Sequence, residues 1–148
     1  MTIKRMDHVG VVVEDLAAAV AFFVELGLEL EGRGEFEGPW MDRTIALQGA
    51  KCEIGMLRIP DGNGRVELSR FISPPVADTS PATAPVNTLG YLRVMFQVDD
   101  LEDVVSRVRE RHGASLVDEI VNYEGVYKLC YVRGPEGILV GLAQQLNG

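Results

Sequence analysis

The sequence has few of the residues that build cysteine- or histidine-rich metal sites, since its 148 residues include only two cysteines and two histidines. Cys52 and Cys130 lie far apart, each within an apolar, strand-like run, and no Cys-x-x-Cys pair is present. This spacing argues against a zinc site or a redox motif built from cysteine. We expect two buried free thiols, because cysteine packs as a small hydrophobe.

Basic residues are also scarce, because 14 Lys and Arg stand against 22 Asp and Glu, which gives a formal net charge of -8. Nucleic acids and anionic membranes bind basic surfaces, so we expect neither as a partner. No apolar run approaches the roughly 18–20 residues that span a bilayer. The N-terminal segment has no signal-type apolar core. These absences predict a soluble, cytoplasmic protein.

What the chain does contain is an internal repeat. Residues 8–16 (HVGVVVEDL) align with residues 93–101 (RVMFQVDDL), and each segment is a strand-like run that ends in acidic residues and Leu before a helical pattern. A Pro-x-Gly turn followed by an apolar strand also recurs, at residues 60–68 and 135–142. The order of elements is therefore the same in both halves, although their identity is low.

The first half has the pattern of a β-α-β-β-β unit. Asp15 is expected to cap a helix over residues 16–26, and Gly27 is expected to end it. Alternation of apolar residues places His8 on the strand face opposite Val9. Strands are expected near residues 6–13, 28–36, 43–47, 52–59 and 66–71, and the bounds of the middle pair are the least distinct.

The second half predicts the same unit, with a helix over residues 101–111 and strands near residues 91–98, 115–122, 126–133 and 138–143. The segment 73–88 between the halves is rich in Pro, Ala, Ser and Thr and predicts a surface linker. We expect an α+β fold in which two β-α-β-β-β modules, related by pseudo-two-fold symmetry, form a curved sheet around a cleft. The modules, about residues 1–72 and 89–148, would make one domain spanning residues 1–148.

This paired pattern resembles the vicinal-oxygen-chelate (VOC) superfamily, which includes glyoxalases, bleomycin-resistance proteins and extradiol dioxygenases. The resemblance covers nearly the whole chain. Its residues are MDHVGVVV at 6–13, DL at 15–16, FF at 22–23, VEL at 66–68, residues 90–101 and GPEGI at 134–138. It implies a protein that binds or acts on a small molecule, and it implies a homodimer, because superfamily members of this size commonly pair.

In metal-using members of this superfamily, each module supplies ligands from its first and last strands. The resemblance places His8 and Glu67 at these positions in the first half, and Arg93 and Gly141 in the second. Arginine stays protonated and only donates hydrogen bonds, and glycine has no side chain. The resemblance therefore implies a degenerate site, in which His8 and Glu67 are the remaining metal ligands and bind a divalent metal weakly unless other groups complete the site.

Without a metal, His8, Glu67 and Arg93 are still expected to converge on the cleft. His8 and Glu67 would be the catalytic acid or base. Arg93 would bind an oxygen-bearing or anionic ligand through its guanidinium, and Met95 and Gln97 would extend the ligand-binding surface on the same strand face. The alternative is a cluster that satisfies itself, with Glu67 paired to Arg93.

Three functions stay open on these residues. The first is a metal-dependent, glyoxalase-like lyase or isomerase; the second is a metal-free binder of a small oxygenated or anionic molecule, which the replaced ligands favour. The third is a metal-free enzyme that uses His8 and Glu67 directly. Extradiol dioxygenase chemistry is least favoured, because it needs two histidines and a carboxylate around iron, and His112 lies at a helix end. Further candidates for lining the cleft are Phe36, Trp40, Met41 and Tyr91.

Overall fold

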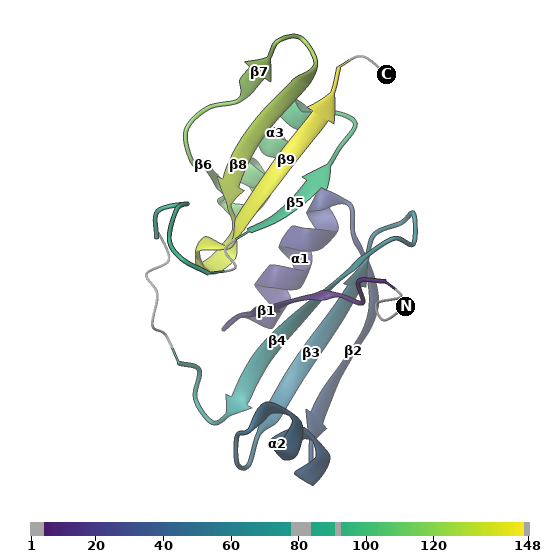
Figure 1. Cartoon of the computed structure of the whole chain (residues 1–148), viewed down its shortest axis with the longest axis vertical. Helices are drawn as coiled ribbons and strands as arrows, with labels where there is room; N and C mark the ends of the chain where they lie inside the picture. Colours follow the sequence, from purple (N-terminus) through teal and green to yellow (C-terminus); the bar gives the residue numbers. More distant parts are fainter. Residues whose placement is uncertain (1–4, 78–83, 91–92, 147–148) are drawn as a thin grey trace. The chain divides into compact units, whose positions relative to one another are not determined.

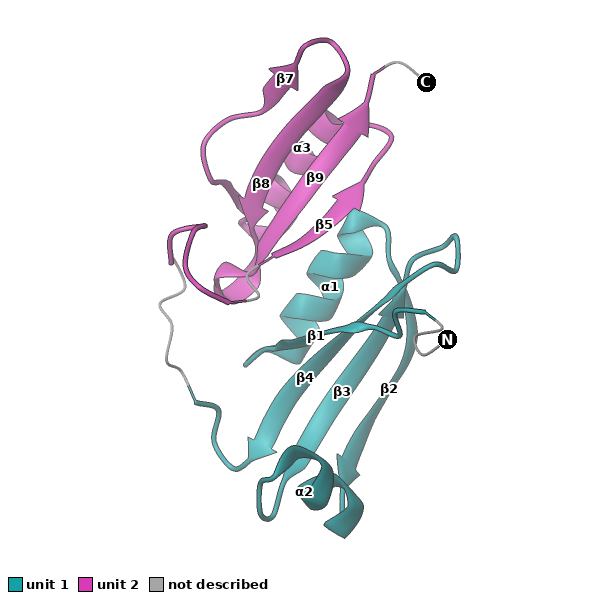
Figure 2. Ribbon diagram, in the orientation of Figure 1, with its two compact units in different colours: residues 1–78 teal, residues 79–148 magenta. Residues whose placement is uncertain are grey.

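A computed structural model describes residues 5–77, 84–90 and 93–146 of the chain (Figure 1). The chain divides into two compact units, Met1–Asp78 and Thr79–Gly148 (Figure 2). Within the described residues, no helix is long and apolar enough to cross a membrane.

Unit 1 is a four-stranded sheet with one long helix, α1, packed on it (Figure 1). The strand order is β1-β4-β3-β2, in which β1 is parallel to β4 and the other neighbours are antiparallel. The elements are β1 (Val9–Val12), α1 (Leu16–Leu26), β2 (Glu29–Glu37), α2 (Pro39–Ile45), β3 (Lys51–Arg58) and β4 (Arg65–Ser73).

Helix α1 begins and ends where the sequence predicts. The Asp15 carboxylate accepts a hydrogen bond from the Ala18 N–H at 3.0 Å, and Gly27 ends the helix in the left-handed conformation at φ 118°. The sheet comes close to α1 at Gly55, where an added Cβ would lie 3.2 Å from a methyl group of Val20. The core between helix and sheet is formed by Leu16, Ala19, Phe22, Phe23, Leu57, Val66 and Leu68.

The strand predicted near residues 43–47 is wrong, because residues up to Ile45 belong to helix α2. Pro39 occupies the first turn of α2, where its fixed φ favours a helix and its missing N–H costs nothing. The Asp42 carboxylate then accepts hydrogen bonds from the N–H groups of Gly49 and Ala50, at 3.0 and 2.9 Å. These local contacts favour the helix and the turn after it over a strand.

Unit 2 repeats the arrangement around helix α3. Its sheet has the order β5-β9-β8-β6, with β7 paired to β8 and with β5 parallel to β9. The single strand predicted over residues 115–122 is instead two short strands. The elements are β5 (Arg93–Gln97), α3 (Leu101–His112), β6 (Ser115–Leu116), β7 (Val121–Tyr123), β8 (Tyr127–Arg133), the 3-10 helix η1 (Pro135–Gly137) and β9 (Leu139–Gln145).

The predicted repeat is confirmed at the level of strand register. Gly10 pairs with Glu67 across β1 and β4, and Met95 pairs with Gly141 across β5 and β9. Both units thus place the first and last strands of a β-α-β-β-β module side by side. The predicted α+β class is confirmed. Residues 78–83 of the predicted linker and the candidate Tyr91 lie outside the described residues.

Candidate functional site

The sheet face of unit 1 opposite α1 carries ordered rows of side chains. Alternation along β3 and β4 turns Leu57 and Leu68 toward α1 and their sequence neighbours to the other face. Strand register aligns these neighbours across the sheet. The rows are Phe36–Cys52–Phe71, then Gly34–Ile54–Ser69, then Gly32–Met56–Glu67.

A cavity of about 760 Å³ lies over these rows, a size typical of small-molecule sites. Helix α2 closes one end with Trp40, Met41, Thr44 and Ile45, and it lies where β4 finishes (Figure 1). The two glycines of β2 keep the space open. A Cβ at Gly32 would meet nothing within 4 Å, and one at Gly34 would meet only the Phe36 ring, at 3.6 Å.

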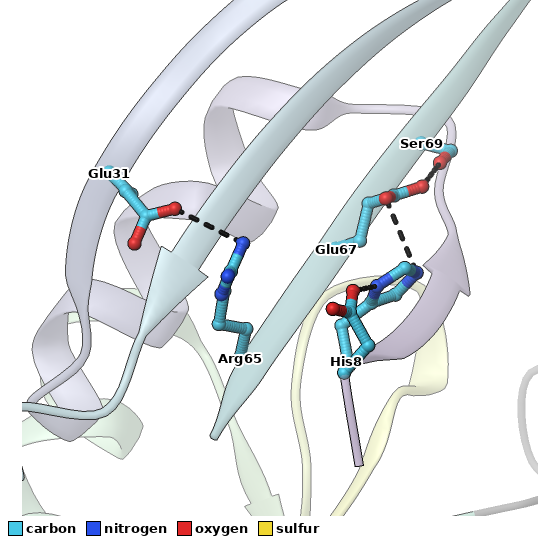
Figure 3. Close-up of polar contacts among 6 residues, drawn as sticks. His8, Glu31, Arg65, Glu67 and Ser69 are labelled. Carbon is cyan, nitrogen blue, oxygen red and sulfur yellow. Dashed lines mark hydrogen bonds and ion pairs between the residues drawn. The ribbon is translucent and has the colours of Figure 1, made fainter. Parts of the chain in front are cut away.

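At the other end of the cavity, His8 and Glu67 point toward one another (Figure 3). His8 precedes β1 and Glu67 lies in β4, so the parallel pairing of these strands brings them together. The Nε2 atom of His8 is 3.3 Å from Oε2 of Glu67, and its Nδ1 atom is 2.7 Å from Oδ2 of Asp7. The Ser69 hydroxyl donates to the other oxygen of Glu67 at 3.3 Å. The His8 and Glu67 side chains are 33% and 23% exposed, so both reach solvent and cavity.

These contacts determine what the pair can do. The hydrogen bond from His8 lowers the pKa of Asp7, and the positive charge of Arg65 lowers it further. An ionised Asp7 accepts the Nδ1–H of His8, which leaves Nε2 facing Glu67. A neutral imidazole would then direct a lone pair at the lone pairs of a carboxylate. The contact therefore calls for one proton, or a cation, between the two groups, and suits the pair to proton transfer.

The two cysteines are buried and free, as the sequence predicts. Burial raises the pKa of Cys52, and the negative charge of Glu67 raises it further. Burial alone raises the pKa of Cys130 to about 11. Both groups are thiols at neutral pH, so neither is an activated nucleophile.

Comparison with known proteins identifies the family. A family model described as the Glyoxalase/Bleomycin resistance protein/Dioxygenase superfamily matches residues 5–142. The chain belongs to this superfamily. A glyoxalase family protein from Bacillus cereus is 52% identical, with a TM-score of 0.95 over 99% of this chain and 97% of that one.

Two more distant proteins are also similar to the chain. The uncharacterized protein YwbC of Bacillus subtilis (strain 168) is 26% identical over 136 residues, which cover 90% of this chain and 92% of YwbC. A glyoxalase/dioxygenase from Nostoc punctiforme shares the fold, with a TM-score of 0.65 at 18% identity over 97% of this chain and 92% of that one.

The donor set of this glyoxalase-superfamily protein does not fit a four-ligand metal site. Among the described residues, no group of three or more His, Cys, Asp or Glu side chains could hold a metal ion. In unit 2 the guanidinium of Arg93 stacks over the Tyr131 ring, 5.2 Å from its centroid. An added Cβ at Gly141 would lie 3.0 Å from Cγ of Met95. Met95 thus occupies the space that a carboxylate at position 141 would need.

The structure places the predicted site residues in two groups. His8 and Glu67 are in contact within unit 1. Arg93, Met95 and Gln97 share the more exposed face of β5 in unit 2. Of the further candidates, Phe36, Trp40 and Met41 line the cavity of unit 1.

Several residues that line the cavity or contact the His8–Glu67 pair are not among the candidates predicted from the sequence. Ser69 and Phe71 follow Glu67 at two-residue steps, so alternation along β4 could have indicated both. Asp7 is adjacent to His8 but lies before the strand, and nothing in the pattern marks it as a partner of the imidazole. The roles of Gly32 and Gly34 depend on the register of β2 with β3, which the sequence does not show.

Proposed function

We propose that this glyoxalase-superfamily protein binds, or acts on, a small oxygenated or anionic molecule in the cavity of unit 1. The observation that carries the proposal is the His8–Glu67 contact at the polar end of a largely apolar cavity. A ligand oxygen placed there would meet a pair of groups suited to sharing one proton. The body of the ligand would pack against Ile54, Phe71 and Trp40.

If the protein is an enzyme, the same arrangement supports a lyase or isomerase reaction. Glu67 would take a proton from the substrate and His8 would return one, or the two roles would be exchanged. Asp7 and Ser69 would hold the imidazole and the carboxylate in position. This chemistry uses only side chains of the chain itself.

The anionic option depends on Arg93. We propose that Arg93, Met95 and Gln97 extend the ligand-binding surface, in a domain whose modules of about residues 1–72 and 89–148 share one cleft. A guanidinium suits a carboxylate or phosphate because its donors form a planar fork. Its stacking on Tyr131 keeps that fork in place. Replacement of Arg93 by Gln should weaken the binding of anionic ligands and leave the binding of neutral ligands unchanged.

The alternative, a metal-dependent glyoxalase-like enzyme, needs donors beyond His8 and Glu67. Zinc sites use four ligands, or three and a water. We propose that the protein holds little tightly bound divalent metal. Metal analysis of the purified protein tests this, because near-stoichiometric metal that is lost in His8→Ala would favour the metal-dependent alternative.

We also propose that the protein is a cytoplasmic homodimer, as its superfamily membership and size suggest. Light scattering at micromolar concentration should give twice the mass of one chain, and a monomeric mass would contradict this.

The binding proposal is tested by a screen of small oxygenated compounds, neutral and anionic, with ligand-detected NMR. Hits should bind the wild-type protein and lose binding in Glu67→Gln. Glu31→Gln is the matched control, because Glu31 pairs with Arg65 at 3.4 Å and does not line the cavity (Figure 3). The proposal would be contradicted if no compound binds, or if the hits bind Glu67→Gln as well as they bind the wild-type protein.

A further inference from the structure

We infer that the cavity takes an elongated, uncharged amphipathic molecule, with a hydroxyl-bearing head at His8 and Glu67 and an apolar body that runs along the strands toward α2. This inference rests on the proposed function and names the ligand class for the same site. The proposed function includes both oxygenated and anionic molecules, and we infer that the head group is a hydroxyl rather than a carboxylate.

The rows of the sheet set the length and polarity of the ligand. Neighbouring rows are two residues apart along each strand, or roughly 6.6–6.8 Å. The Glu67 row and the Phe71 row are therefore about 13 Å apart. Polarity falls along this path, from Glu67 through Ser69 to Phe71. At the far end, Met41 and Cys52 are buried and pack with Ile54 and Phe71. A head with one or two oxygens and an extended apolar body matches this gradient.

The charges around the cavity disfavour an anionic head. Arg33 is the one lysine or arginine among the described lining residues, and its guanidinium lies 3.3 Å from Glu53. Arg70 also contacts Glu53, at 3.4 Å, from the neighbouring strand. At the polar end, His8 stands between Asp7 and Glu67. A carboxylate head would meet the charge of Glu67 beside apolar walls, where like charges repel strongly. A hydroxyl can instead donate its hydrogen bond to Glu67.

The two glycines of β2 provide the space for the apolar body. Glycine is disfavoured inside strands because it packs nothing, yet Gly32 and Gly34 both lie on the cavity face. A side chain at Gly34 would stand in the middle row, between the head and the aromatic end. Since an added Cβ there meets only the Phe36 ring, at 3.6 Å, a larger residue can enter without displacing the backbone.

The chain contains a single tryptophan, Trp40, which lines the cavity and is 57% exposed, so its fluorescence reports on occupancy. Three probes separate head from body. Phenylbutanol has the proposed head and body, phenylbutyrate replaces the hydroxyl with a carboxylate, and benzyl alcohol shortens the body. We expect phenylbutanol to bind at least about 10-fold more tightly than either of the other two, because three methylene groups or one repelled charge each contribute about that much.

Gly34→Leu locates the body of the ligand. This variant should bind phenylbutanol at least about 10-fold more weakly than the wild-type protein does. Its affinity for benzyl alcohol should change by no more than about threefold, because benzyl alcohol does not reach beyond the head end. Glu35→Leu is the matched control, since it places the same side chain on the other face of β2 and should change neither affinity. Circular dichroism checks that the variants fold, and the smaller substitution Gly34→Val replaces Gly34→Leu if that variant does not.

The outcomes distinguish the ligand class from the proposed function. Phenylbutyrate binding as tightly as phenylbutanol would overturn the uncharged head, and an unchanged phenylbutanol affinity in Gly34→Leu would overturn the extended body. In either case, loss of binding in Glu67→Gln with retention in Glu31→Gln would leave the proposed function standing. No response from any probe would overturn this inference, whereas the proposed function falls only if the oxygenated compounds of the NMR screen also fail to bind.

Discussion

The Nε2 atom of His8 lies 3.3 Å from Oε2 of Glu67, although the whole of β1, α1, β2, α2 and β3 lies between them in the sequence. The parallel pairing of β1 with β4 makes this contact, and the Asp7 carboxylate on the opposite ring nitrogen orients the imidazole. A carboxylate and an imidazole held in this way can share one proton.

Asp7→Asn should lower stability in a pH-dependent way. The pKa of Asp7 is lowered in the folded protein, so its ionised form stabilises the folded state above the unfolded value near 3.8. This contribution is lost as the pH falls through the lower folded pKa. In urea unfolding, the wild-type protein should be more stable than Asp7→Asn at neutral pH, and the difference should shrink well below pH 3.8. A difference that is the same at both pH values would exclude this role for the carboxylate.

Glu67→Gln should make Cys52 more reactive and leave Cys130 unchanged. The charge of Glu67 raises the pKa of Cys52, so its removal increases the thiolate fraction at a given pH. Alkylation of Cys52 by iodoacetamide at mildly alkaline pH should accelerate roughly twofold or more. Mass spectrometry of the digested protein measures both sites. Equal acceleration of Cys130 would indicate a general opening of the protein, and no change at Cys52 would place Glu67 too far from the thiol.

Gly141→Ala should destabilise the protein by about 1–3 kcal/mol, as overpacking does. The added Cβ would lie 3.0 Å from Cγ of Met95 and 3.2 Å from Cε1 of Tyr131. Met95→Ala removes the first of these contacts. The double variant Gly141→Ala/Met95→Ala should therefore lose less stability than the sum of the losses in the two single variants. Thermal denaturation of all four proteins measures the coupling, and additive effects would contradict the contact.

The close contact between Met95 and position 141 also affects an attempt to restore a metal site. Arg93→His with Gly141→Glu adds two donors and removes a positive charge, and should raise zinc or nickel affinity if the second module lines the same cleft. The increase should be larger when Met95 is shortened to Ala, which makes room for the glutamate. Calorimetric titration with zinc measures it. Unchanged affinity in the folded triple variant would mean that positions 93 and 141 do not face the His8–Glu67 pair.

Asp100→Ala should cost about 1 kcal/mol of stability, whereas Asp99→Ala should cost less than about half of that. Only Asp100 caps α3, through a hydrogen bond of 3.1 Å from the Asp103 N–H to its carboxylate. Chemical denaturation of the two variants measures the difference. Equal losses would mean that the acidic pair acts through its charge at the helix N-terminus rather than through the cap.

The sequence predicts the elements whose signals are local. Helix α1 lies between the predicted cap Asp15 and the predicted end at Gly27, and α3 extends one residue beyond the predicted range of 101–111. Helix α2 was not predicted. It depends on Pro39 in its first turn and on the hydrogen bonds that the Asp42 carboxylate accepts from the following turn.

The site, like the fold, was predicted only in part. The resemblance to the superfamily selects His8 and Glu67, and strand pairing explains why they meet. Phe36, Trp40 and Met41 of the cavity were among the predicted candidates. The rest of the lining could not be predicted, because it depends on which residues of β2 lie beside Cys52 and Ile54. A shift of one residue in that register would turn Gly32 and Gly34 to the other face.

The central claim is that Glu67 holds the polar group of a ligand in the cavity of unit 1. It is tested most directly by calorimetric measurement of Kd for the tightest oxygenated ligand with the wild-type protein, Glu67→Gln and Glu31→Gln. Hydrogen bonds to charged groups contribute about 1.5–3 kcal/mol, so Kd should rise at least about 10-fold in Glu67→Gln. It should stay within about twofold in Glu31→Gln, whose carboxylate pairs with Arg65 outside the cavity. An unchanged Kd in Glu67→Gln, or an equal rise in both variants, would contradict the claim.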